Sequence, residues 1–218
     1  MNQQNTGSWL PEPANARAYT AEFDRFYTRF SRAYDILVRL FPIWRNWLQA
    51  ALPLIKGPRV LEVGFGTGYL MTQYADHCEA YGVDINSALI KVARANLDRA
   101  GIRASLEQAS VEKLPYPAGC FDTVLSTMAL SGFPRGEQAL AEMTRVLKPE
   151  GRLIILDIAL PRDGNLAGTV IARAFEAGGD ILRDMSVLLE HSGYDYEVTA
   201  VGGFGAVQRA AGTKGPGD

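Results

Sequence analysis

The sequence contains few of the side chains that metal sites, disulfides and histidine-based catalysis require. Among its 218 residues there are two cysteines and two histidines. Cys78 and Cys120 do not form a CxxC pair, and no group of His, Cys, Asp and Glu has the spacing of metal ligands. His77 and His191 are each expected at a helix end, in surface or capping roles. No metal site is therefore expected, and the sequence singles out no catalytic residue.

Long apolar runs and an excess of one charge are also lacking. No apolar stretch approaches the ~18 residues that a membrane-spanning helix needs, and no secretory leader is recognisable. The net charge of −2 gives no general attraction to nucleic acid or to anionic membranes. We therefore expect a soluble cytoplasmic protein whose partners do not include nucleic acid. With 47% hydrophobic residues, the chain can bury the core of one globular domain.

One stretch, residues 59–84, has the pattern of a nucleoside-binding βαβ unit. A short apolar strand runs into the glycine-rich turn of residues 64–68, which opens a helix. A second strand, residues 80–83, then ends at Asp84, about 20 residues after the first glycine of the turn. Glycines let the backbone turn sharply and come close to a ligand, and a carboxylate can accept both hydrogens of a ribose diol.

The details of the turn indicate which nucleoside it suits. Tyr69 occupies the position at which a dinucleotide-binding turn has its third glycine, which counts against NAD. No Lys-Ser/Thr pair follows the turn, so a P-loop is excluded. Glu62 precedes the turn, and its carboxylate would repel a phosphate but suits a ligand that carries a cationic amine.

The segment from Glu62 to Gly68, together with Asp84, resembles motifs I and II of the class I S-adenosylmethionine-dependent methyltransferases. The resemblance covers residues 34–158 and is nearest to the ubiquinone/menaquinone, sterol and phospholipid methyltransferases. It implies S-adenosylmethionine as cofactor, a small-molecule acceptor and methyl transfer by in-line displacement. It also implies a Rossmann-like α/β fold, with a seven-stranded sheet in the order 3-2-1-4-5-7-6, an antiparallel strand 7 and helices on both faces.

The same resemblance implies a cofactor site made of residues at the strand ends. Glu62 would hold the methionyl amine, and Asp84 would bind the ribose hydroxyls. Ser110 stands where the family usually has an acid that accepts from the adenine amino group, and Val111 would offer its backbone N–H to the ring. The whole expected set is Glu62, Gly64, Phe65, Gly66, Gly68, Asp84, Ile85, Ser110, Val111, Thr127 and Tyr34.

The flanking segments are predicted from periodicity. The first helix, residues 15–40, has aromatic residues at i, i+3, i+4 spacing: Phe23, Phe26, Tyr27, Phe30 and Tyr34. These residues could pack on the sheet, form a lid over the cofactor, or form an amphipathic surface that collects a lipid-like substrate. Further helices are expected over residues 43–55, from the capping residue Ser87 to about Ala100 and over residues 180–191, whereas residues 161–179 show no clear pattern. We expect a single domain of five segments: a disordered stretch (1–13), an N-terminal helical lid (14–56), a cofactor-binding core (57–160), acceptor-side helices with a closing hairpin (161–211) and a tail (212–218).

Two other classes of protein remain open. A non-catalytic cofactor-binding relic of a methyltransferase would fit Ser110 and the absence of the histidine that many small-molecule members carry after strand 4. An NAD-dependent oxidoreductase would use the same βαβ unit, although no Tyr-x-x-x-Lys pair is evident. The sequence leaves room for peripheral contact with a membrane, and it determines neither the acceptor nor the oligomeric state.

Overall fold

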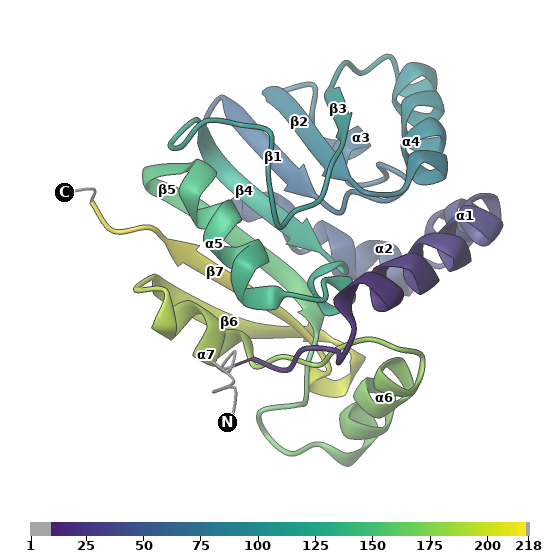
Figure 1. Cartoon of the computed structure of the whole chain (residues 1–218), viewed down its shortest axis with the longest axis vertical. Helices are drawn as coiled ribbons and strands as arrows, with labels where there is room; N and C mark the ends of the chain where they lie inside the picture. The colour runs from purple at the N-terminus through teal and green to yellow at the C-terminus, as the bar shows by residue number, and fades with distance from the viewer. Residues whose placement is uncertain (1–9, 217–218) are drawn as a thin grey trace, which may run out of the picture.

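The computed structural model describes residues 10–216, and its centre is one mixed sheet with helices on both faces (Figure 1). The strand order is β3-β2-β1-β4-β5-β7-β6; β1 to β5 pair in parallel, while β7 runs antiparallel to both β5 and β6. The predicted fold class and strand order are confirmed. The strands are β1 (Arg59–Val63), β2 (Glu79–Asp84), β3 (Ser105–Gln108), β4 (Phe121–Thr127), β5 (Leu147–Ile158), β6 (Asp195–Gly202) and β7 (Val207–Thr213).

Side chains alternate between the two faces of the sheet and define two cores. In β1, Leu61 and Val63 belong to the core under α5 and α7, whereas Val60 belongs to the core under α2, α3 and α4. A smaller cluster packs α6 against β5 and β7. No helix within residues 10–216 is long and apolar enough to cross a membrane. The helices are α1 (Ala16–Leu40), α2 (Pro42–Gln49), α3 (Met71–Tyr74), α4 (Ser87–Ala100), α5 (Gly136–Val146), α6 (Leu166–Ala177) and α7 (Met185–His191).

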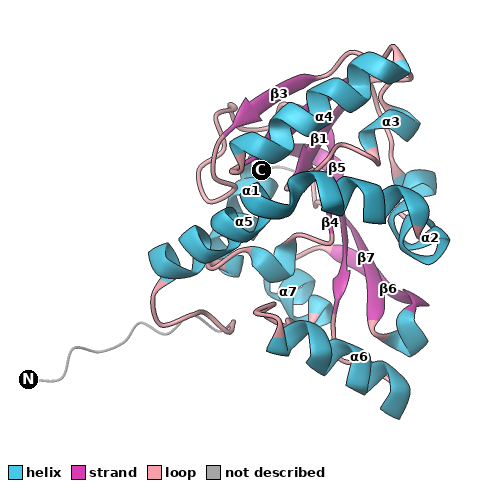
Figure 2. Cartoon of the chain, turned by 90° about the vertical axis from the view of Figure 1, so that its right-hand side faces the viewer, coloured by secondary structure: helices cyan, strands magenta, loops and turns pink. Residues whose placement is uncertain are grey.

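Helix α1 lies across the edge of the sheet at which the parallel strands end. Figure 2 shows it between α4 and α6. The predicted aromatic positions lie on one side of this helix, but only part of that side packs against the sheet edge. Phe23 and Tyr27 turn toward the sheet edge and line a cleft there, whereas Phe26 and Phe30 are 56% and 42% exposed. Of the three roles that the spacing left open, packing on the sheet therefore does not apply to Phe26 and Phe30, whose rings are exposed.

Two of the predicted helix boundaries are wrong for local reasons. The helix expected over residues 43–55 ends at Gln49 and is followed by a short 3-10 turn, Leu52–Leu54. Pro53 lies in that turn, and proline has no N–H to continue the helical hydrogen bonds. At the start of α4 the capping residue is Asn86 and not Ser87, because the Asn86 side chain accepts from the Leu89 N–H.

The region after β5 differs most from the prediction. Residues 161–179, which show no clear pattern, contain the 12-residue helix α6, capped by the Asn165 side chain. The helix expected over residues 180–191 instead begins at Met185, with Asp184 as its cap. The residues before Met185 form hydrogen bonds outside the helix: the Ile181 N–H donates to the Ser131 carbonyl at 2.8 Å. A tertiary contact thus replaces the first turns of the expected helix.

Both ends of the described chain are more ordered than predicted. Leu10 is 6% exposed and packs in the α5/α7 core, so the disorder expected for residues 1–13 does not extend to it. Strand β7 continues to Thr213, inside the segment expected to be a tail, and the Lys214 N–H donates to the Gly151 carbonyl. The remaining parts of these two predictions, residues 1–9 and 217–218, lie outside the described residues.

Candidate functional site

A cleft lies at the carboxyl ends of β1, β2 and β4, beneath α1, which is where open parallel sheets bind their ligands. All of the expected cofactor-site residues except Gly68 line it. We call the two groups of segments that build it the β1–β3 turn cluster (residues 62–69, 84–87 and 109–112) and the β4–β5 side (residues 127–134 and 178–183); not every residue of these segments lines the cleft. Neither His77 nor His191 lines the cleft. Within residues 10–216, no group of His, Cys, Asp and Glu is arranged to hold a metal.

Two glycines of the turn have different surroundings. Gly66 has φ +56, and a Cβ built on it would meet only the Tyr34 ring, at 3.8 Å, so its open side faces the cleft. Gly68 has φ +70, and a Cβ there would approach the Ala93 Cβ to 3.0 Å. Gly68 therefore lets the turn pack on α4, while Gly66 keeps space free for a ligand.

Asp84 ends β2 with its carboxylate fixed by backbone donors. Its Oδ2 accepts from the Gly66 N–H at 2.9 Å, and its Oδ1 accepts from the Asn86 N–H at 2.9 Å. Burial raises the pKa of Asp84 to about 6, and the side chain is 7% exposed. Each oxygen keeps a lone pair for a further bond, so the carboxylate can accept from two neighbouring hydroxyls of a ligand. This arrangement fits a ribose.

Glu62 lies near the end of β1 as a second buried carboxyl group. Its two oxygens accept from the Tyr74 hydroxyl at 3.1 Å and the Thr127 hydroxyl at 3.3 Å. Glu62 is 1% exposed, and burial raises its pKa to about 8. Among the described residues, no cation pairs with it. A buried carboxylate is stable only when it is paired, so the site fits the cationic amine of an S-adenosylmethionine ligand.

The turn after β3 forms the other end of the turn cluster. The Ser110 hydroxyl oxygen accepts from the Glu112 N–H at 3.2 Å and so closes its own turn. That oxygen keeps a second lone pair, but a serine accepts more weakly than the acid usual in the resembling family. Val111 is buried beside it, while Ile85, after β2, is 44% exposed at the cleft.

Tyr34 and Asp35 on α1 separate in the structure. Tyr34 lines the cleft opposite Gly66. Asp35 turns away, accepts from the Asn96 side chain at 2.8 Å and pairs with Arg39. Only the tyrosine of these two neighbours can therefore reach a ligand, and the aspartate fastens α1 to α4.

Sequence reasoning missed Asn86, which fastens α1 over the end of β2. Its side-chain amide donates to the Asp24 carboxylate and to the Thr28 hydroxyl, both at 2.8 Å, while its oxygen caps α4. Asparagine is a common N-cap residue, so the sequence could have predicted the capping role of Asn86. It could not have predicted the partners of Asn86 on α1, because they lie about 60 residues away in the sequence.

The β4–β5 side was missed almost completely. Ser131 is buried and forms hydrogen bonds in three directions: its N–H donates to Asp157, its hydroxyl to Asp180, and its carbonyl accepts from Tyr19. Burial raises the pKa of Asp157 to about 6 and also raises that of Asp180. These residues come from four separate parts of the chain, so no spacing in the sequence connects them.

The Arg183 side chain anchors the same side. Its guanidinium lies buried and donates to the carbonyls of Leu130 at 2.6 Å and Phe133 at 2.7 Å. Burial lowers the pKa of Arg183, and these carbonyls stabilise its charge. Arg183 thereby holds the segment before α7 against the loop after β4.

Comparisons with known proteins place the chain among methyltransferases. Residues 61–155 match the methyltransferase domain family. The ubiquinone/menaquinone biosynthesis C-methyltransferase of Azotobacter vinelandii is 32% identical over 173 residues, which cover 76% of this chain and 68% of that protein. The protein of the same name from Bordetella parapertussis is 30% identical over 155 residues, which cover 69% of this chain and 60% of that protein. The chain thus spans about two thirds of the length of these relatives.

Solved structures with the same fold are more distant in sequence. Phosphoethanolamine N-methyltransferase 2 of Haemonchus contortus, in complex with S-adenosyl-L-methionine, aligns with a TM-score of 0.73 at 16% identity, over 90% of this chain and 60% of that one. The [4+2]-cyclase SpnF aligns with a TM-score of 0.72 at 17% identity, over 97% of this chain and all of the other. Similarities at this level establish the fold alone.

Proposed function

The chain belongs to the class I S-adenosylmethionine-dependent methyltransferases, with S-adenosylmethionine as its cofactor, and we propose that it methylates a hydrophobic, quinone-like small molecule. The membership also removes the NAD-dependent oxidoreductase from the alternatives. The cofactor supplies a methyl group on a positively charged sulfur. The protein mainly has to hold this group and the acceptor in line, and such positioning can contribute about 7–11 kcal/mol.

The pair of buried carboxyl groups in the turn cluster carries the assignment of the cofactor site. We assign Asp84 to the ribose hydroxyls, Glu62 to the methionyl amine, and Gly66 to close contact with the ligand. The support for these roles is geometric: Asp84 has a free lone pair on each oxygen, Glu62 has no described cationic partner, and a side chain on Gly66 would project into the cleft.

The acceptor class rests on two observations. The two relatives reported above are named for ubiquinone and menaquinone biosynthesis. Apolar and aromatic side chains also line the cleft beyond the turn cluster, among them Phe23, Tyr27 and Phe133. A planar, hydrophobic ring suits such a lining. The helical lid assigned to residues 14–56 would then exclude water from both ligands.

Titration calorimetry and a turnover assay together test this function. The purified protein should bind S-adenosylmethionine and S-adenosylhomocysteine at micromolar concentrations and should not bind NAD. With radiolabelled S-adenosylmethionine, it should transfer label to quinol-containing lipid extracts. Binding without transfer to any extract would favour the non-catalytic relic, and binding of NAD alone would contradict the assignment of the turn.

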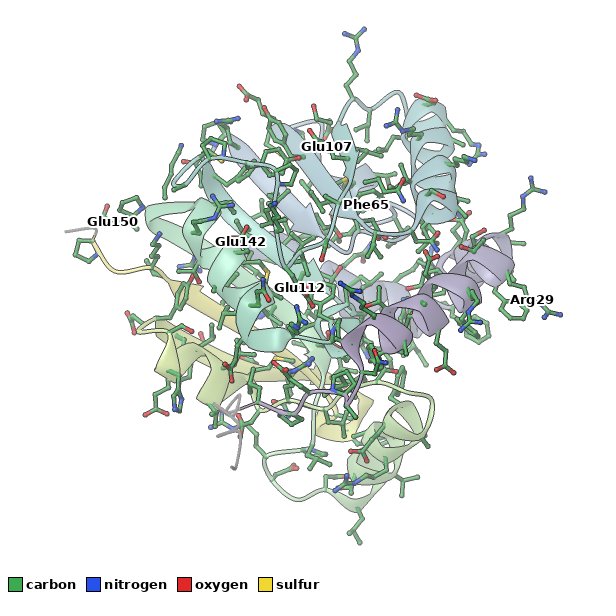
Figure 3. All side chains as sticks on the ribbon, viewed as in Figure 1. Arg29, Phe65, Glu107, Glu112, Glu142 and Glu150 are labelled. Atoms are coloured by element: carbon green, nitrogen blue, oxygen red, sulfur yellow. The ribbon has the colours of Figure 1, made fainter. Side chains whose placement is uncertain are left out.

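We further propose that the protein works in the cytoplasm at the surface of an anionic membrane, where hydrophobic quinones reside. Exposed apolar residues follow one outer stripe of α1 and continue into α2: Phe26, Phe30, Ile36, Leu40, Phe41 and Ile43. Arginines accompany the stripe, and Arg29 extends from α1 away from the body of the protein (Figure 3). Apolar side chains beside cations suit the interface of an anionic bilayer.

Vesicle sedimentation tests this contact. Wild-type protein should sediment with phosphatidylcholine vesicles that contain phosphatidylglycerol, and less with pure phosphatidylcholine. Replacing Phe26 and Phe30 by serine should reduce the bound fraction, whereas the same change at Leu166 and Val170, exposed apolar residues on α6, should not. An equal loss of vesicle binding in both variants would contradict a specific contact through α1 and would indicate binding through any exposed apolar residue.

A further inference from the structure

We propose that Asp180, held in place by Ser131, and Tyr27 form a subsite for a neutral hydroxyl group of the methyl acceptor, and that Asp180 takes up the proton of this hydroxyl. The inference rests on the proposed function and specifies the acceptor chemistry within it. It uses the part of the β4–β5 side beyond Thr127, to which the cofactor assignment gives no role.

The charge of the cleft restricts the acceptor. Several acidic residues line it, and none of the described lining residues is Lys, Arg or His. A phosphate or carboxylate on the acceptor would be repelled there, because charges in a partly buried site are poorly screened. A neutral acceptor is compatible with this environment. The acidic residues are Asp24, Glu62, Asp84, Glu112 and Asp180.

The strand order places Asp180 beyond the proposed cofactor. Asp84 ends β2, Glu62 lies near the end of β1, and Thr127 ends β4, so these three residues follow the sheet in the order β2-β1-β4. The next strand is β5, where the Asp157 carboxylate accepts a hydrogen bond from the Ser131 N–H at 3.0 Å. Ser131 in turn contacts Asp180. A ligand that occupies the first three strand ends therefore has Asp180 at its far end, where the second substrate must bind.

Asp180 is held in a defined position with one oxygen available. Its Oδ1 accepts from the Ser131 hydroxyl at 2.7 Å, and no described donor contacts its Oδ2. The backbone on either side is fixed, because the Tyr19 hydroxyl donates to the Gly179 carbonyl at 2.8 Å and the Ile181 N–H donates to Ser131. A partly buried carboxylate that lines a cleft with an unused oxygen is suited to accept from a ligand hydroxyl.

Tyr27 offers the second polar group of the subsite. Its ring packs edge-on against Tyr34 with 5.5 Å between centroids, and its hydroxyl makes no hydrogen bond to a described residue. Burial, together with the charge of Asp180, raises the pKa of Tyr27 to about 12, so this hydroxyl stays protonated. The Tyr27 hydroxyl can donate a hydrogen bond to the hydroxyl oxygen of the acceptor, while Asp180 accepts a hydrogen bond from that same hydroxyl.

The proton balance of the transfer gives Asp180 its role. The acceptor gains a methyl group and loses a proton, while the positive charge of the methyl donor disappears. Asp180 takes the hydroxyl proton at Oδ2, and the O–H electron pair stays with the acceptor. The acceptor forms its new bond to the methyl carbon as the carbon–sulfur bond of the methyl donor breaks and leaves its electron pair on sulfur. Where the new bond forms at a ring carbon, the proton of that carbon moves to the acceptor oxygen and restores its hydroxyl. Burial raises the pKa of Asp180 above that of an exposed aspartate, which makes its carboxylate a stronger proton acceptor.

Calorimetry with a matched pair of probes tests the subsite without turnover. In the presence of S-adenosylhomocysteine at pH 7, wild-type protein should bind 2-naphthol about tenfold more tightly than 2-methoxynaphthalene, which has no hydroxyl proton. Asp180→Ala should lose this preference, whereas Glu176→Gln, an exposed acid on α6, should keep it. S-adenosylhomocysteine should bind all three proteins within a factor of two.

The pH dependence of 2-naphthol binding provides a second readout. Affinity should fall at acidic pH as Asp180 becomes protonated, and Asp180→Asn should remove this fall. The other titratable groups that face Asp180 are three tyrosines of α1 and Asp157 of β5, and Arg183 carries the positive charge on its own segment. The tyrosines are Tyr19, Tyr27 and Tyr34. All of these remain in Asp180→Asn, so they serve as an internal control.

The outcomes separate the subsite from the proposed function. Equal binding of the two probes by wild-type protein, or an unchanged preference in Asp180→Ala, would overturn the inference while leaving cofactor binding intact. Failure of wild-type protein to bind S-adenosylhomocysteine would instead overturn the proposed function, and the inference with it.

Discussion

The β1–β3 turn cluster and the β4–β5 side of the cleft are built in different ways. In the turn cluster the decisive hydrogen bond, from Gly66 to Asp84, joins residues 18 positions apart. On the β4–β5 side, Ser131 and Asp180 are 49 positions apart, and Tyr19 and Gly179 are 160 apart. The first part uses backbone groups at the ends of adjacent strands, and the second uses side chains that only the complete fold brings together.

This difference explains how one fold can hold a constant cofactor while it varies the second substrate. Backbone donors at strand ends follow from the topology of the sheet and need only glycine and an acid at fixed positions. The β4–β5 side depends on loop conformation and on individual side chains, such as Arg183, that can be exchanged without disturbing the strands. If this is correct, damage to either part should leave the other intact.

The largest effect is expected from Arg183→Met. This change leaves the buried carbonyls of Leu130 and Phe133 without their donor, and hydrogen bonds from a charged donor contribute roughly 1.5–3 kcal/mol each. We expect the free energy of unfolding in urea to fall by about 3 kcal/mol. S-adenosylhomocysteine should still bind the folded protein within threefold of wild type. A comparable loss of binding would mean that the two parts are coupled.

Asp84→Ala should break the turn cluster selectively. It removes an acceptor for two ligand hydroxyls and also leaves the Gly66 and Asn86 N–H groups unpaired. Binding of S-adenosylhomocysteine, measured by calorimetry, should weaken about 100-fold, which follows from losing two bonds to a charged group. The matched control is Asp76→Ala, an exposed acid before β2. An unchanged dissociation constant in Asp84→Ala would refute the ribose assignment.

Substitutions at Gly66 and Gly68 should have different effects, because Gly66 faces the cleft and Gly68 packs on α4. Gly66→Val places a side chain in the cleft and should weaken S-adenosylhomocysteine binding at least tenfold, about 1.4 kcal/mol. Gly68→Val instead crowds Ala93 on α4, so it should lower the melting temperature more than it lowers affinity. Normal binding by Gly66→Val would show that the ligand does not approach this turn.

The smallest effect concerns Glu62 and pH. Because the folded-state pKa of Glu62 is raised to about 8, the folded protein retains a proton that the unfolded chain has lost, and stability falls as pH rises toward 8. Asp84 and Asp157, whose pKa values are raised to about 6, add to this fall at lower pH. Glu62→Gln should therefore raise the melting temperature of the ligand-free protein at pH 8 by a few degrees, for a gain of ~1 kcal/mol.

The same substitution should weaken S-adenosylhomocysteine binding at pH 8, because the ligand amine loses its counter-charge. Melting curves at pH 5 and pH 8, with and without the ligand, separate the two effects. If Glu62→Gln were less stable than wild type at pH 8, the raised pKa would be contradicted.

Local patterns predicted much of the fold. The glycine turn with Asp84 indicated the βαβ unit and, through the resemblance, the strand order that the structure has. Helix α1 and the closing hairpin were also correctly predicted. The failures have local causes at α2, where Pro53 stops the helix, and at α4, where Asn86 is the cap. At Asp180–Asp184 the cause is tertiary, because Ser131 and the loop after β4 compete for the groups that would form the first turns of a helix.

The sequence by itself determined the β1–β3 turn cluster, the proposed cofactor end of the cleft, because strand, glycine turn and terminal acid are separated by short, regular distances that fix their positions on neighbouring strands. Only the tertiary structure decided which α1 aromatics face the cleft, that Asp35 turns away from it, and that Asp180 meets Ser131 and lines the same cleft as Tyr27. Those contacts depend on how α1 and the segment after α6 pack on the sheet. Packing between distant segments depends on how the side chains of the whole chain fit together, so it cannot be predicted from the spacing of residues within one segment.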